Sequence, residues 1–265
     1  MNILDKIIEH KKAEVAERKL SAPTAVLEKS DFFSRPTLSL KDFLLDDTKT
    51  GIITEFKRKS PSKGVINGDA DVVSVTNAYT KYGACCLSVL TDEHFFGGTT
   101  ADLIKARAND IPILRKDFII DEYQIIEAKA MGADVILLIA ACLSARSVKQ
   151  LAGFAKKLEL DILLELHAEE ELGHICDETG LVGINNRNLK TFEVDIGRSL
   201  EMARKIPTGK IKIAESGISA AATIQLFKEN GFQGFLMGEN FMKEVDPGKA
   251  FAKFVQELNI PSGQG

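Results

Sequence analysis

The sequence predicts an α/β fold, a (β/α)8 (TIM) barrel with a helical extension at its N-terminus. Eight short strand-like segments alternate with helical patterns after residue 50, which is typical of a parallel sheet. Polar residues recur at the C-terminal ends of these strands, where such barrels keep their active sites. The 265 residues suit one barrel of about 250 residues. We therefore expect a single barrel domain over 1–265, in which 1–50 form the extension.

The extension is expected to be largely helical. Residues 2–19 place Ile3, Leu4 and Ile7 at helical spacing among charged residues, which predicts an amphipathic helix. A second, short helix is expected at about Leu40–Leu45. The apolar stripe of the first helix either packs against the barrel only or also covers its mouth and walls an aromatic pocket, and we favour the second reading.

Strands and helices then alternate to the C-terminus. Strands are predicted at Ile52–Lys57, Cys85–Thr91, Ile113–Lys116, Val135–Ala140, Ile162–Leu166, Val182–Asn185, Ile211–Glu215 and Gly234–Met237. Helices are predicted at Asp71–Lys81, Glu122–Met131, Ser144–Leu158, Ala168–Glu178, Asp195–Lys205, Ala220–Asn230 and Gly248–Leu258. Several end at a glycine, such as Gly83 or Gly132, because glycine readily adopts the left-handed conformation that ends a helix. No G-x-G-x-x-G follows the first strand, which argues against a dinucleotide-binding fold.

Composition excludes several classes of protein. A net charge of -4 argues against a surface that binds nucleic acid or acidic membranes. No apolar run approaches the roughly 20 residues of a membrane span, and the N-terminus lacks the pattern of a signal peptide. The four cysteines show no metal-binding spacing, so we expect buried free thiols, a cytoplasmic location and no metal.

The end of the first strand carries an unusual pair of charges. Glu55 and Lys57 are two residues apart, so they share one face with Ile53, while Thr54 and Phe56 take the other face. Buried charges are tolerated when they are paired or take part in chemistry. For this segment alone, a structural ion pair and an active-site pair are equally good interpretations.

Four later strands show the same pattern and favour the active-site interpretation. One ends in Lys116, one contains Glu165, and one ends in Asn185 with Arg187 close behind. Another ends in Glu-Ser-Gly at 215–217.

The last two strands are followed by glycines that predict a phosphate site. Ser216 and Gly217 follow the seventh strand, and Gly238 and Glu239 follow the eighth. In (β/α)8 barrels these two loops frequently bind phosphate through backbone N–H groups.

Several ordered motifs together resemble the indole-3-glycerol-phosphate synthase family. They are Ile53-Thr54-Glu55-Phe56-Lys57-Arg58-Lys59-Ser60-Pro61-Ser62, Phe95-Phe96-Gly97-Gly98, Pro112-Ile113-Leu114-Arg115-Lys116-Asp117-Phe118-Ile119, Gly183-Ile184-Asn185-Asn186-Arg187-Asn188-Leu189 and Ala214-Glu215-Ser216-Gly217-Ile218. The resemblance implies closure of the indole ring of 1-(2-carboxyphenylamino)-1-deoxyribulose 5-phosphate, with loss of carbon dioxide and water, in tryptophan biosynthesis. It implies a small sugar-phosphate substrate and no cofactor, and we expect a monomer.

The resemblance also implies roles for individual residues. Lys116 would be the general acid, Glu165 its acid/base partner, and Glu55 with Lys57 a pair that positions and helps to protonate. The substrate would contact Ser60, Phe96, Phe118, Asn185, Arg187 and Leu189, and its phosphate would contact Ser216, Gly217, Gly238 and Glu239. Because Glu239 is a carboxylate, we expect only its backbone N–H to face the phosphate.

The chemistry suggests how these groups would titrate. We expect neighbouring cations such as Lys57, together with partial burial, to lower the pKa of Lys116, and an apolar strand to raise the pKa of Glu165. His94, His167 and His174 are expected to be non-catalytic.

The alternative functions are a sugar-phosphate isomerase on the same barrel and a phosphate-binding barrel without catalysis. The Glu-x-Lys pair fits the first poorly, and the presence of Lys116 and Glu165 argues against the second.

Overall fold

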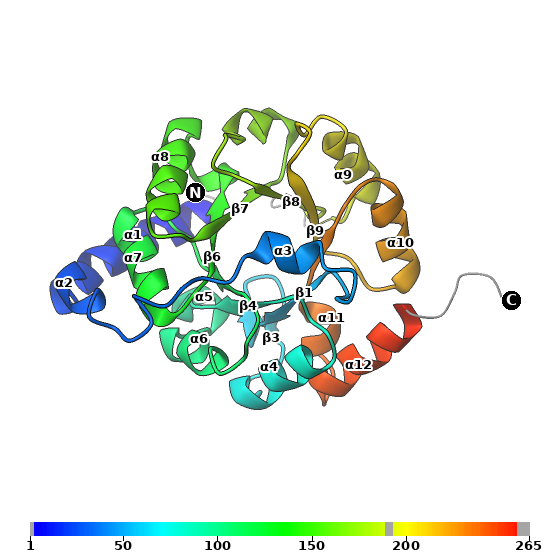
Figure 1. Ribbon diagram of the computed structural model, residues 1–265, viewed down its shortest axis with the longest axis horizontal. Coiled ribbons are helices and arrows are strands. Elements are labelled where there is room, and N and C mark those ends of the chain that lie inside the picture. The colour runs from blue at the N-terminus through cyan, green and yellow to red at the C-terminus, as the bar shows by residue number, and fades with distance from the viewer. Residues whose placement is uncertain (1–2, 189–192, 259–265) are drawn as a thin grey trace, which may run out of the picture.

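The structure is a computed structural model that describes residues 3–188 and 193–258. Within them, eight parallel strands close into a barrel, which confirms the predicted fold class (Figure 1). The strands are β1 (Ile52–Phe56), β4 (Cys86–Leu90), β5 (Ile113–Lys116), β6 (Val135–Ile139), β7 (Asp161–Leu166), β8 (Leu181–Asn185), β9 (Ile211–Glu215) and β10 (Gly234–Met237). They follow one another around the ring in chain order, and the pairing of Thr54 with Met237 helps to close it.

Helices surround the ring of strands (Figure 1). The helices that follow β1 are α4 (Val72–Lys81), α5 (Glu93–Phe96), α6 (Thr100–Ala106), α7 (Glu122–Met131), α8 (Ala145–Lys157), α9 (Ile196–Ala203), α10 (Ala221–Glu229), α11 (Glu239–Met242) and α12 (Pro247–Leu258). Two short 3-10 helices lie at Ala140–Cys142 (η1) and Glu169–His174 (η2). Aspartate or serine caps several helices, as Asp121 does when it accepts from the N–H of Tyr123.

The N-terminal extension contacts both ends of the barrel. It contains α1 (Ile3–Ser21), α2 (Thr24–Leu27) and α3 (Leu40–Leu44). Helix α3 crosses the centre of the ring in Figure 1, and its Leu40 and Leu44 join the apolar cluster inside the strands. The N–H of Leu40 donates to Oδ2 of Asp161, the first residue of β7, so α3 covers the N-terminal end of the barrel.

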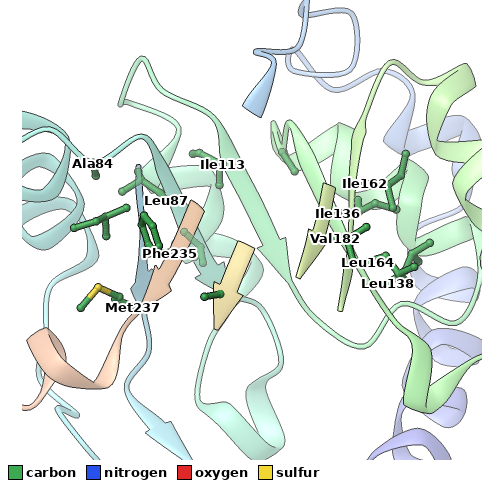
Figure 2. Close-up of a cluster of buried hydrophobic side chains, with 14 of the residues drawn as sticks. Ala84, Leu87, Ile113, Ile136, Leu138, Ile162, Leu164, Val182, Phe235 and Met237 are labelled. Carbon is green, nitrogen blue, oxygen red and sulfur yellow. The ribbon is translucent and has the colours of Figure 1, made fainter. Parts of the chain in front are cut away.

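Side chains alternate between the inside and the outside of the barrel. Inward residues such as Ile53, Leu114 and Leu163 form one buried cluster with α3. Outward residues form a larger cluster with the helices, and Figure 2 shows part of it, including Leu87 and Phe235. Period-two alternation on β1 therefore directs Glu55 inward with Ile53, as predicted.

Some elements differ from the prediction. The helix predicted at 168–178 is only the 3-10 turn η2, because Gly173 is a poor helix former and the ring of His174 bonds back to the carbonyls of Glu171 and Leu143. Helix α6 and the hairpin β2 (Lys59–Ser60) with β3 (Gly64–Val65) were not predicted. The hairpin places Ser60 beside the mouth of the barrel.

The described residues contain neither a helix that could cross a membrane nor a group of three or more side chains suited to a metal ion. All four cysteines are unpaired. Cys85 and Cys86 are buried as expected, whereas Cys142 and Cys176 are partly exposed, which corrects that prediction for these two residues.

Candidate active site

A cavity of about 920 Å³ occupies the C-terminal mouth of the barrel. Side chains from the ends of β1, β5, β7, β8 and β9 line its floor, and the loop after β10 adds to its rim. Ile3, Leu4 and Ile7 of α1 line it as well. The apolar stripe of α1 therefore does more than pack against the barrel, because it forms part of the cavity wall.

Glu55 and Lys57 form a close ion pair at the end of β1. Nζ of Lys57 lies 2.6 Å from Oε1 of Glu55, and the side chains are 16% and 6% exposed. Burial favours the neutral carboxyl, but Lys57 and Lys116 outweigh it and lower the pKa of Glu55. Glu55 is therefore ionised at neutral pH.

Lys116, the last residue of β5, lies between two carboxyl groups. Its Nζ is 3.3 Å from Oε2 of Glu165 and 3.9 Å from Oε2 of Glu215. Although burial favours the neutral amine, Glu165, Glu215 and Glu55 together raise the pKa of Lys116. The predicted lowering of this pKa is wrong, because three carboxyl groups outweigh the effect of burial.

Glu165 on β7 accepts from several donors. Its Oε1 lies 2.7 Å from Nε2 of His167 and 3.0 Å from Nδ2 of Asn185. Burial alone would raise the pKa of Glu165, but Lys116, His167 and Asn185 lower it. The predicted raised pKa is therefore also wrong, because Lys116, His167 and Asn185 together outweigh the effect of burial.

Glu215 at the end of β9 is the carboxyl group with the raised pKa. Burial and the charges of Glu165 and Glu55 raise it well above the ordinary value, and Lys116 offsets only part of this effect. The sequence analysis assigned no role to Glu215. Ile211 and Ile213 face the inside of the barrel, so period-two alternation could have placed Glu215 there too.

His167 lies inside the site, although we expected no catalytic role for it. The residue is 7% exposed, and it lines the cavity beside Glu165. Burial favours neutral imidazole, but the Glu165 carboxylate next to Nε2 raises the pKa of His167. Its backbone N–H donates to Oε2 of Glu171 at 2.6 Å, which fixes the turn after β7.

An aromatic wall stands at one side of the cavity. The rings of Phe96, from α5, and Phe118, from the loop after β5, have centroids 6.0 Å apart. Ser60 lines the cavity, and its Oγ lies 3.4 Å from Oγ of Ser62. Leu189, which was predicted to contact the aromatic ring, lies outside the described residues.

The loops after β9 and β10 adopt compact backbone conformations. Ser216 has a φ of 67°, which is uncommon for a residue with a Cβ, and its carbonyl accepts from Nδ2 of Asn186 at 2.7 Å. Gly217 has a φ of 70°, and a Cβ there would collide with Val194. A Cβ on Gly238 would lie 2.8 Å from the Cβ of Glu55. A residue with a Cβ would therefore not fit at either position without a shift of its neighbours.

Glu239 begins helix α11, and its side chain is 41% exposed. Its carboxylate lies 3.7 Å from Nζ of Lys63 and 3.8 Å from Nη2 of Arg187. Asn185 holds the start of the Arg187 segment, because Oδ1 of Asn185 accepts from the Arg187 N–H at 3.0 Å. Two cations thus accompany the carboxylate at this end of the cavity.

The fold and this site define a (β/α)8 barrel of the enzyme type, with a cavity lined by paired lysine and glutamate side chains at its C-terminal mouth. The family model for indole-3-glycerol phosphate synthase matches residues 4–254. The chain belongs to this family.

Similar proteins agree with this assignment, and a solved structure agrees with the fold. The chain is 43% identical over 258 residues to the indole-3-glycerol phosphate synthase of Bacteroides thetaiotaomicron, covering 97% of this chain and 99% of the relative. It is 44% identical over 260 residues to that of a Polaromonas species, covering 95% and 97%. A chain of the tryptophan synthase complex from Pyrococcus furiosus has a TM-score of 0.58 at 19% identity, covering 80% of this chain and 98% of that one, and this likeness shows the fold alone.

Proposed function

We propose that the protein acts as a carboxy-lyase in tryptophan biosynthesis, converting 1-(2-carboxyphenylamino)-1-deoxyribulose 5-phosphate to indole-3-glycerol phosphate, carbon dioxide and water. Membership of the family supports this activity. The observation that carries the chemistry is the Lys116 ammonium between Glu165 and Glu215 in the cavity at the barrel mouth. The Lys116 proton donor therefore lies next to one carboxyl group with a lowered pKa, Glu165, and one with a raised pKa, Glu215.

Lys116 is the general acid of ring closure in this proposal. The aromatic carbon that bears the carboxylate attacks the ketone carbon, a carbon–carbon bond forms, and the ketone oxygen takes a proton from Lys116. The bond to the carboxylate then breaks, and its electrons restore the aromatic ring as carbon dioxide leaves. Because the free enzyme keeps Lys116 protonated, the acid is present in the required form before substrate binds.

The two glutamates complete the proton balance. Glu215 has a raised pKa and returns a proton to Lys116 after the first step. In the dehydration step the hydroxyl group leaves as water with a proton from Lys116, and the carboxylate of Glu165 accepts the proton from the carbon next to nitrogen. Glu165 then passes this proton to Lys116, and solvent reprotonates Glu215, because the reaction as a whole consumes one proton. Lys57, paired with Glu55, attracts the substrate carboxylate and supports protonation.

The substrate would span the cavity from one wall to the other. The phosphate binds Ser216 and the backbone N–H groups of Gly217, Gly238 and Glu239, since the first N–H groups of a helix have no partner within it. The benzoate ring lies at the wall formed by Phe96 and Phe118, and Leu189 is proposed to extend this wall. Ser60, Asn185 and Arg187 contact the chain between these two ends.

Incubation of the pure protein with the carboxyphenylamino-deoxyribulose phosphate tests the proposal. Indole fluorescence should rise together with one equivalent of carbon dioxide. A sugar-phosphate isomerase would release no carbon dioxide, and a barrel without catalysis would give neither signal. Folded protein that gives no fluorescence above background rules the proposal out.

We also propose that the enzyme acts as a monomer in the cytoplasm. The assigned site residues that the structure describes line a single cavity of this chain, and the unpaired thiols suit a reducing compartment. Light scattering on the purified protein should give a mass near 29.0 kDa. A mass near twice that value would contradict the monomer.

A further inference from the structure

Lys11 of helix α1 is a fully buried cation outside the proposed catalytic groups. Its Nζ lies 2.8 Å from a carboxylate oxygen of Glu14 and 2.9 Å from those of Asp92 and Asp117. Burial favours the neutral amine, but Asp117, Asp92 and Glu14 raise the pKa of Lys11 to about 12. A buried charge is costly unless it is paired, so the arrangement requires all of these partners.

Two of these partners hold the aromatic wall of the cavity. Asp92 is the N-cap of α5, and its Oδ1 accepts from the N–H groups of Phe95 at 2.8 Å and Phe96 at 3.3 Å. Asp117 follows Lys116 directly, and its Oδ1 accepts from the N–H of Phe118 at 2.8 Å. Lys11 therefore joins the short segments that carry both wall rings.

Asp92 and Asp117 depend on Lys11 to different degrees. Asp117 keeps other partners without it, because Arg115 lies 3.0 Å away and Thr91 donates at 2.7 Å. In the described part of the chain, Lys11 is the cation that pairs with Asp92. Loss of the Lys11 charge should therefore disturb the Phe96 segment more than the position of Lys116.

We propose that Lys11 is a positioning residue for the aromatic end of the substrate. Its ammonium fixes Asp92, and through it Phe96, against the helix whose Ile3, Leu4 and Ile7 line the same cavity. This inference rests on the proposed function, because the ring that the wall receives is the benzoate or indole ring of that reaction.

Lys11→Met tests the proposal by removing the charge and keeping the volume. The wall binds the ring in both the ground state and the transition state, so KM should rise about tenfold while kcat changes by less than about threefold. Affinity for indole-3-glycerol phosphate should fall by a similar factor, whereas affinity for glycerol 3-phosphate should stay unchanged. The helix should remain docked, because Arg18 still pairs with Glu127 at 3.0 Å.

Lys19→Met is the matched control. Lys19 belongs to the same helix and pairs with Asp121 at 2.7 Å, on the surface and away from the cavity. The Lys19→Met variant should keep the KM, the kcat and the affinities for indole-3-glycerol phosphate and glycerol 3-phosphate of the unmodified protein. If Lys11→Met is not recovered folded, Asp92→Asn keeps the cap acceptor, loses the charge pair and should raise KM in the same direction.

Three results would overturn the proposal. They are an unchanged KM in the folded variant, a loss of kcat at constant KM, and an equal loss of affinity for glycerol 3-phosphate. Turnover by the unmodified protein is measured first, so a failure of the proposed function is seen separately from a failure of this inference.

Discussion

Gly183 on β8 faces the carboxyl group of Glu215 on β9 so closely that a Cβ at position 183 would collide with Oε1 of Glu215. The absence of a side chain on one strand therefore creates the space for a buried carboxyl on the next. Glu215 reaches Lys116 from this position.

Gly183→Ala should move the Glu215 carboxyl and lower kcat by on the order of tenfold or more, because small displacements of catalytic groups have large kinetic effects. Steady-state kinetics with the carboxyphenylamino-deoxyribulose phosphate measures the loss. Gly180→Ala is the control, since a Cβ there meets nothing within 4 Å. Equal activity in both variants would show that the position of Glu215 is unimportant for turnover.

Lys116→Met should lower kcat by on the order of 10²-fold or more, because it removes the proposed general acid. The fold should persist, and circular dichroism can check this. Lys156→Met removes a lysine from the surface pair with Asp161 and should change nothing in the assay. A loss below tenfold would exclude Lys116 as the acid.

His167 should titrate above the ordinary histidine pKa of about 6.5 because Glu165 stabilises the imidazolium. The stabilisation is fully present below that ordinary value and is lost as pH rises through the raised pKa of the folded protein. The free energy of unfolding of the unmodified protein, relative to that of His167→Gln, should fall over this window. Ring NMR titration provides the direct measurement.

The matched control for this titration is Glu165→Gln, which removes the charge and should bring the pKa of His167 down. A His167 pKa that is the same in both proteins would contradict the assigned cause.

Asp134→Ala should destabilise the protein by about 3–5 kcal/mol, because it leaves the buried Arg107 and the partly buried Arg35 without their carboxylate partner. Asp134 pairs with Arg107 at 2.6 Å and accepts from the N–H groups of Leu38 and Ile113. Urea unfolding measures the change, and Asp177→Ala, at an exposed position, should have little effect. Destabilisation below about 1 kcal/mol would mean that this network contributes little.

The barrel could be predicted because its strands carry local signals. The bounds of β5, β9 and β10 match the prediction, since each strand is a short apolar run that ends at polar residues or glycine. Helix α6 was missed, although Thr99 and Asp102 form a capping box at its start. That signal was present in the sequence but was not used.

The charges at the mouth could be located from sequence, but their titration could not be predicted. Lys116 and Glu165 each lie near the C-terminal end of their strand. Because the parallel strands close into a ring, these ends meet at one mouth of the barrel, and the two side chains converge there. The sign of each pKa shift depends on distances to Glu215 and His167, and no sequence spacing contains those distances. Glu215 received no role because its carboxyl was interpreted together with the serine and glycine that follow it.

Leu44 of α3 lies against Gly234 at the start of β10, where an added Cβ would be 3.1 Å from Cδ2 of Leu44. One side of the packing surface for α3 therefore exists only when the final strand has been made. Synthesis of the last strand thus sets the moment at which the bottom of the barrel can be sealed.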